Sequence, residues 1–123
     1  MAIEYEIKDG VLIVRQRGEI STREIYQKFS EALADPLVVD GTYLLWDGRE
    51  ASSVRSSDEL RESLARFIAS AKKLQNKVAI LATRDLNYGM SRMFATYARP
   101  EFEVRIFSDE ETATTWLKSH DDG

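Results

Sequence analysis

The sequence predicts an α/β fold that consists of an N-terminal β-hairpin followed by four strand–helix (βα) units. Four apolar runs of strand length each precede a polar turn and an amphipathic segment: Val11–Arg17, Tyr43–Asp47, Val78–Thr83 and Phe102–Phe107. A fifth segment, Ile3–Ile7, alternates apolar and charged residues and is joined to the first run by Asp9-Gly10. Strands that alternate with helices in so short a chain form a mostly parallel sheet. We therefore expect a mostly parallel five-stranded sheet with one antiparallel edge strand.

The hairpin and the first helix carry the clearest local signals. Asp9-Gly10 is a strong hairpin turn because both central residues of that turn need positive φ. Ser21 and Glu24 have the spacing of a capping box, which predicts that a helix begins here. Proline cannot continue a helix, so Asp35-Pro36 predicts where this helix ends.

Three more helices are predicted downstream, each opened by a capping residue. The longest spans about 57–75 after Ser56, and another spans about 86–98 after Asp85. The last begins at Ser108. Together with the first helix, they complete the four strand–helix units.

The runs at 43–46 and 78–82 are apolar on both faces, as expected of central strands. Asp47–Glu50 is predicted to turn the chain out of the sheet. If each strand lies beside its predecessor, right-handed crossovers place the helices on one face. No topological switch point then exists, which argues against a bound nucleotide. The other face would need cover, so we expect a homodimer.

Composition excludes several classes of function. The chain has 123 residues, a net charge of −4 and no cysteine. This length predicts one domain over residues 1–123, and the lack of cysteine excludes disulfides, thiolate metal sites and cysteine nucleophiles. A negative net charge argues against nucleic acid as a partner. No apolar run reaches membrane-spanning length and the first residues do not resemble a signal peptide, so we expect a cytoplasmic protein without membrane contact.

The motifs of common catalytic and cofactor chemistry are missing from the sequence. His120, the one histidine, lies in the polar C-terminal tail, where a histidine is usually solvated. The sequence contains no glycine-rich phosphate loop and no metal-ligand spacing. We therefore expect no catalytic residue, no metal and no cofactor.

Polar residues gather where the predicted strands end. Asp47 and Arg49 follow one central strand, and Arg84 and Asp85 follow the next. The carboxyl ends of parallel strands share one sheet edge, so these four residues would line a ligand crevice. Two carboxylates there could serve as acid and base or could hold magnesium. The structural interpretation is equally economical, because Asp85 would cap a helix and Asp47 would begin a turn.

The order of elements and several motifs resemble STAS domains, the SpoIIAA-like fold of bacterial anti-sigma-factor antagonists. The closer resemblance is to an uncharacterised bacterial STAS-like group. The motifs are Ala34–Pro36, Leu45–Ala51, Leu86–Phe94 and Val104–Phe107 with Ala113, Trp116 and Leu117. The resemblance spans nearly the whole chain and implies a single STAS-like domain with a non-catalytic interaction or sensing role.

In those antagonists a phosphorylated serine lies within Asp-Ser-Ser-Gly, at the start of the helix after the third strand. The matching stretch here is Arg55-Ser56-Ser57-Asp58, in which arginine replaces the aspartate and aspartate replaces the glycine. The resemblance makes Ser56 and Ser57 candidate phosphorylation sites. On the residues alone, Ser56 is a helix cap and Ser57 is solvated.

Three functional hypotheses follow. The first is a homodimeric STAS-like module that binds an unknown protein partner. The second is a carrier or sensor of a small apolar ligand, such as a lipid or acyl group, which distant relatives of the fold suggest. The third is an enzyme that uses Asp47 and Asp85, although no nucleophile, metal set or cofactor loop accompanies these acids.

Overall fold

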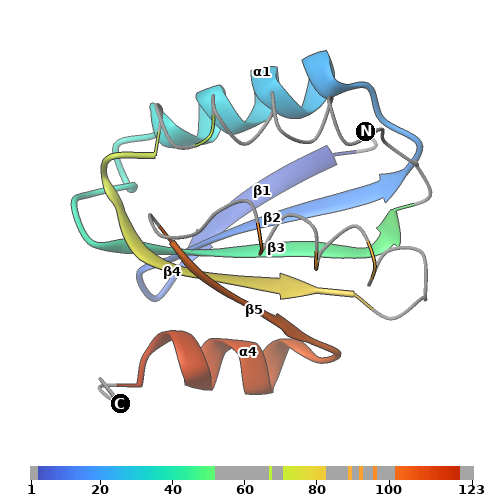
Figure 1. The fold of residues 1–123 in the computed structure, drawn as a ribbon. Helices are drawn as coiled ribbons and strands as arrows, with labels where there is room; N and C mark the ends of the chain where they lie inside the picture. The colour runs from blue at the N-terminus through green and yellow to red at the C-terminus, as the bar shows by residue number, and fades with distance from the viewer. Residues whose placement is uncertain are drawn as a thin grey trace.

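The chain folds into a five-stranded mixed sheet with helices on both faces (Figure 1). The computed structural model describes residues 3–51, 67, 71–82, 89, 92, 96 and 102–119. The strands are β1 (Ile3–Lys8), β2 (Val11–Gly18), β3 (Thr42–Ala51), β4 (Leu74–Leu81) and β5 (Glu103–Phe107). They lie in sequence order, with β1 antiparallel to β2 and all later pairs parallel. The predicted α/β fold and strand order are confirmed.

The hairpin and the first helix form as the sequence predicts. Asp9 and Gly10 have φ angles of 52° and 78°, so both central turn residues are left-handed. Ser21 Oγ accepts a hydrogen bond from Glu24 N at 3.2 Å, and Glu24 Oε1 accepts one from Ser21 N at 3.2 Å. This capping box begins α1 (Thr22–Leu33).

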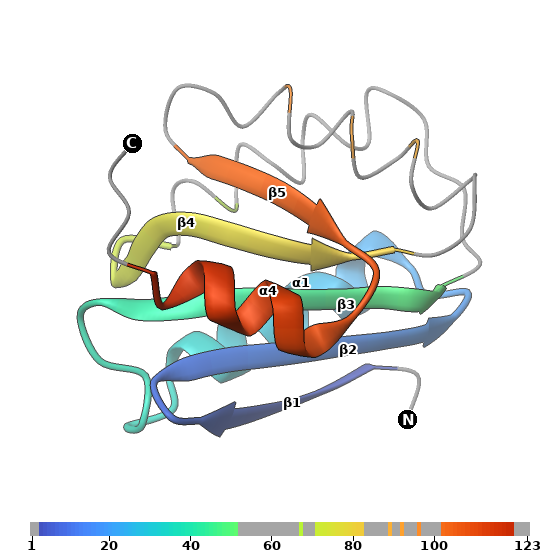
Figure 2. The ribbon, with the colours of Figure 1, turned by 90° about the horizontal axis from the view of Figure 1, so that it is seen from below.

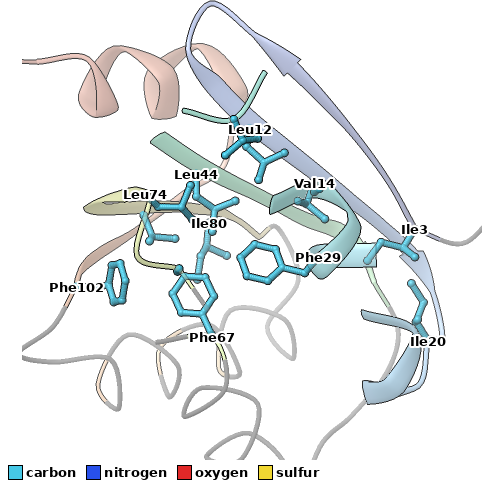
Figure 3. Close-up of a cluster of buried hydrophobic side chains, with 14 residues drawn as sticks. Ile3, Leu12, Val14, Ile20, Phe29, Leu44, Phe67, Leu74, Ile80 and Phe102 are labelled. Atoms are coloured by element: carbon cyan, nitrogen blue, oxygen red, sulfur yellow. The ribbon is translucent and has the colours of Figure 1, made fainter. Parts of the chain in front are cut away.

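The sheet face under α1 carries a large apolar cluster (Figure 3). Leu12, Leu44 and Ile80 reach it from three neighbouring strands. At its centre Phe29 of α1 packs against Phe67, with ring centroids 5.3 Å apart. Two more aromatic rings extend this pair into a row, which we call the aromatic row. The ring centroid of Trp46 lies 5.9 Å from that of Phe29, and the ring centroid of Phe102 lies 5.0 Å from that of Phe67. The four rings therefore form a continuous row within this cluster.

The opposite face is covered by α4 (Glu110–Leu117), as Figure 2 shows from below. Ala113 and Leu117 of α4 are fully buried. The buried strand residues of this second cluster are Val11, Ile13, Leu45, Ala79 and Leu81. The expectation that all helices lie on one face is therefore wrong. The handedness rule governs crossovers between parallel strands, whereas α4 follows the last strand and returns over the other face.

Two strands are longer than the sequence predicts. β3 continues to Ala51, so residues 47–50 extend the strand and do not turn out of the sheet. β4 begins at Leu74, inside the segment predicted as the end of the helix at 57–75. Polar residues favoured a turn and a helix at these places, but pairing with neighbouring strands overrides local preference.

The last helix begins one residue later than predicted. Asp109, and not Ser108, is its N-cap, because the Asp109 carboxylate accepts a hydrogen bond from Thr112 N at 2.8 Å. Most of the predicted helices at 57–75 and 86–98 lies outside the described residues. Within the part of the chain that the structure describes, no helix is long and apolar enough to cross a bilayer.

Candidate functional site

A cluster of charged side chains lies where α4 begins, over the carboxyl-terminal parts of β2 and β3. We call it the charged cluster, and its members are Arg15, Asp47, Arg49 and Glu110. Side chains alternate along a strand, so Arg15 continues the face on which Val11 and Ile13 are buried. Asp47 continues the face of Leu45 in the same way. Arg15 and Asp47 are direct partners in the parallel register.

An irregularity in β3 places Arg49 beside Asp47. Arg15 pairs with Asp47. Arg17, two residues later, pairs with Glu50, so β3 contains one more residue than β2 over this stretch. Arg49 donates to Asp47 Oδ1 from its backbone N at 3.2 Å and from Nε at 3.0 Å, and to Oδ2 from Nη2 at 2.9 Å. The guanidinium therefore holds the carboxylate in a bidentate pair, which is a strong and specific geometry.

Arg15 connects β2 to three other elements. Its Nη1 donates to Asp47 Oδ2 on β3 and to Glu110 Oε1 on α4, both at 3.0 Å. Its Nη2 lies 3.6 Å from Glu6 Oε2 on β1. Burial lowers the pKa of Arg15, but the hydrogen bonds and charges of Glu110 and Asp47 outweigh burial and raise it overall. Arg15 is therefore a permanent cation in contact with three carboxylates.

Asp47 is the buried centre of the charged cluster. Its side chain is 11% exposed, compared with 25% for Arg15 and 33% for Arg49. It accepts four hydrogen bonds, two on each oxygen, which fills the capacity of an ionised carboxylate. Burial raises the pKa of Asp47, but the hydrogen bonds and charge of Arg49, together with the bond from Arg15, outweigh burial and lower it. The carboxylate is therefore ionised and fully bonded at neutral pH.

This arrangement suits a structural role better than acid–base chemistry. A general base needs a lone pair that faces the substrate and a pKa near the working pH, and Asp47 has neither. Among the residues that the structure describes, no buried side-chain nitrogen or oxygen lacks a hydrogen-bond partner. The same part of the chain contains no group of three or more histidine, aspartate or glutamate side chains arranged around a metal position. Arg15 and Arg49 each donate to carboxylates of the chain itself.

Two of the residues predicted to line a crevice belong to the charged cluster. Asp47 and Arg49 contact each other, but inside β3 and not beyond its end. Arg84 and Asp85 lie outside the described residues. The candidate phosphorylation sites, Ser56 and Ser57, also lie outside them.

The sequence analysis missed Arg15 and Glu110. The sequence pattern could have identified Arg15, because it occupies the next inward position after Val11 and Ile13 in an alternating strand. No sequence pattern identifies Glu110 as a partner of Arg15, since it lies 95 residues from Arg15 along the chain. Only the return of α4 over the second sheet face brings the two together.

The fold matches a solved structure. The matching protein is an uncharacterised member of the DUF3478 family from Shewanella loihica PV-4, and it has a SpoIIAA-like fold. The two chains match with a TM-score of 0.62. The match covers 94% of this chain and 92% of that chain, at 20% sequence identity. The predicted SpoIIAA-like fold is thereby confirmed. A comparison with curated proteins found no match. The model of a family described as a domain of unknown function, DUF7793, matches residues 5–121, and the chain belongs to that family.

Proposed function

We propose that the protein is a non-catalytic STAS-like module that binds a protein partner or senses its surroundings, and that it acts as a homodimer. The observation that carries the proposal is the saturation of the Asp47 carboxylate at the centre of the charged cluster. The fold alone is compatible with many functions, so the argument rests on what these side chains can still do.

The charged cluster supports a role without turnover because its groups already bind one another. Asp47 accepts four hydrogen bonds, and Arg15 and Arg49 each donate to carboxylates of the same chain. An active site usually presents an acid, base or nucleophile whose pKa is shifted toward the working pH. The pKa of Asp47 is shifted away from it. Asp47 therefore offers little to the enzyme hypothesis.

Turnover can be tested without a known substrate. The protein is incubated with a bacterial metabolite extract, and depletion of metabolites is followed by mass spectrometry. We expect no metabolite to be depleted by the wild type, by Asp47→Asn or by the exposed control Asp40→Asn. A metabolite consumed by the wild type and by Asp40→Asn, but not by folded Asp47→Asn, would overturn the non-catalytic assignment.

The homodimer proposal is supported by exposed apolar side chains and no longer by an uncovered sheet face. α4 covers the sheet face that was expected to need a partner. Leu37 and Val39, in the loop between α1 and β3, are 67% and 59% exposed. Neighbouring exposed apolar side chains favour an interface. A standard interface buries about 800 Å² on each partner, so other surface residues must contribute to it.

Light scattering after size-exclusion chromatography tests the dimer. The chain has a mass of 14.1 kDa, so the proposal predicts a particle of twice that mass. Replacing both Leu37 and Val39 by serine should shift the particle to the monomer. A wild type that stays monomeric at high protein concentration would contradict the homodimer.

The alternative function is that of a carrier for a small apolar ligand such as a lipid or acyl group. The aromatic row of Phe29, Phe67 and Phe102 would be the natural contact surface, but these residues are only 3–7% exposed. A ligand would therefore have to displace their packing. Native mass spectrometry separates the two functions, because a co-purified apolar ligand favours the carrier, whereas protein without any added ligand mass favours the interaction module.

A further inference from the structure

We propose that α4 is a hinged cover, which opens from the sheet as a unit while the strands and α1 stay folded. α4 has eight residues and follows β5 through only Ser108 and Asp109. An isolated helix shorter than about 12–15 residues is marginal in water. Apart from the Asp109 cap, what keeps α4 helical is therefore its contact with the sheet.

α4 itself contributes few apolar side chains to that contact. Ala113 and Leu117 are the fully buried residues of α4. Trp116 adds a tilted ring contact with Phe107 at a centroid separation of 5.6 Å. The remaining side chains of the helix are half-buried or exposed. Elements with few buried apolar contacts open at lower free energy than the core.

Polar contacts hold both ends of the helix. At its first residue, Glu110 Oε1 accepts a hydrogen bond from Arg15 Nη1 at 3.0 Å. At its last turn, Lys77 Nζ donates to the Trp116 carbonyl oxygen at 2.9 Å and to Ser119 Oγ at 3.2 Å. A cation at the C-terminus of a helix also interacts favourably with the helix dipole.

Both polar contacts can break without leaving a buried charge unpaired. Arg15 remains paired with two other carboxylates: its Nη1 lies 3.0 Å from Asp47 Oδ2, and its Nη2 lies 3.6 Å from Glu6 Oε2. Glu110 is already 38% exposed and passes into water. Lys77 is half-buried, so water can solvate its ammonium group once the contact breaks. Opening therefore avoids the desolvation penalty that usually keeps a buried polar contact closed.

Opening uncovers an apolar strip of the sheet. The strip consists of Val11, Ile13, Leu45, Ala79 and Leu81. The charged cluster without Glu110 remains intact beside it, because Arg49 and Arg15 still bind Asp47. The fold thus contains two states of one sheet face, and the Arg15–Glu110 contact biases the choice between them.

Amide hydrogen exchange with mass spectrometry on the full chain tests the cover. We expect residues 113–117 of α4 to exchange faster than the central residues of β3 and β4. Glu110→Gln should speed exchange in α4 about five- to tenfold, as expected for one partly exposed charge-assisted hydrogen bond, and leave β3 and β4 unchanged. Glu111→Gln is the matched control, because it removes an acid from the same first turn, and it should change α4 less than twofold.

Two kinds of result would overturn the proposal. One is exchange of α4 at the same rate as β3 and β4, with the same response to denaturant, because α4 would then open only with the whole molecule. The other is a Glu110→Gln variant that does not speed exchange in α4, that speeds exchange equally in β3 and β4, or that speeds exchange in α4 no more than Glu111→Gln does.

Discussion

Replacing Asp47 by asparagine removes the charge at the centre of the charged cluster while keeping its shape. Asp47 Oδ1 accepts from Arg49 N and Nε, and Oδ2 accepts from Arg49 Nη2 and Arg15 Nη1. An asparagine has one oxygen and one NH₂ group, so in either orientation two donors lose their acceptor and face another donor.

The size of the effect follows from the bonds that are lost. A hydrogen bond to a charged group contributes about 1.5–3 kcal/mol to stability. The two arginines are 25% and 33% exposed, so water replaces part of the loss. Arg15 also keeps Glu110. We therefore expect Asp47→Asn to lower the free energy of unfolding by about 2 kcal/mol at pH 7.

Urea unfolding followed by tryptophan fluorescence measures this difference. Asp40→Asn makes the same chemical change at an exposed aspartate and should stay within about 0.5 kcal/mol of the wild type. Because folding lowers the pKa of Asp47, its contribution is fully present above the unfolded value of about 4 and is lost as the pH falls through the folded value. The deficit of Asp47→Asn should therefore shrink below about pH 4. A variant as stable as the wild type at pH 7 would refute the reasoning.

Three further predictions concern the helices. Ser21→Ala removes the capping box of α1 and should destabilise the protein by about 1 kcal/mol in urea, whereas Ser30→Ala, at an exposed position of the same helix, should be neutral or stabilising. Phe29→Ala opens the centre of the aromatic row and should destabilise by about 3–5 kcal/mol; a loss below about 1 kcal/mol would mean that the row is not packed as described. Asp109→Ala should lower the thermal midpoint more than Ser108→Ala, and the reverse order would restore Ser108 as the cap of α4.

Local signals in the sequence were enough to predict the strands, their order and the first helix. Asp9-Gly10 fixes the hairpin because few residue pairs accept two left-handed positions. Ser21 and Glu24 fix the start of α1 because both halves of the capping box lie within one turn. These features depend on residues close together in the chain, so pattern analysis reaches them.

The placement of α4 and the membership of the charged cluster could not be predicted in this way. No crossover rule constrains a helix that follows the last strand, so the face covered by α4 depends on packing of Ala113 and Leu117 against distant strands. Asp47 was predicted to begin a turn because only its polar neighbours in the sequence were visible. Its partner on β2, Arg15, lies 32 residues earlier. Ion pairs across a sheet depend on register, and register is not visible in one strand alone.

The measurement that tests the central claim most directly is the pKa of the Asp47 carboxyl group, obtained by nuclear magnetic resonance from the side-chain carbonyl carbon during an acid titration. If Asp47 is a saturated structural carboxylate, it titrates below the ordinary value of about 3.9 and stays ionised from there to neutral pH. A midpoint above about 5 would contradict the account, because Asp47 would then be held by the fold as an acid or base available for chemistry.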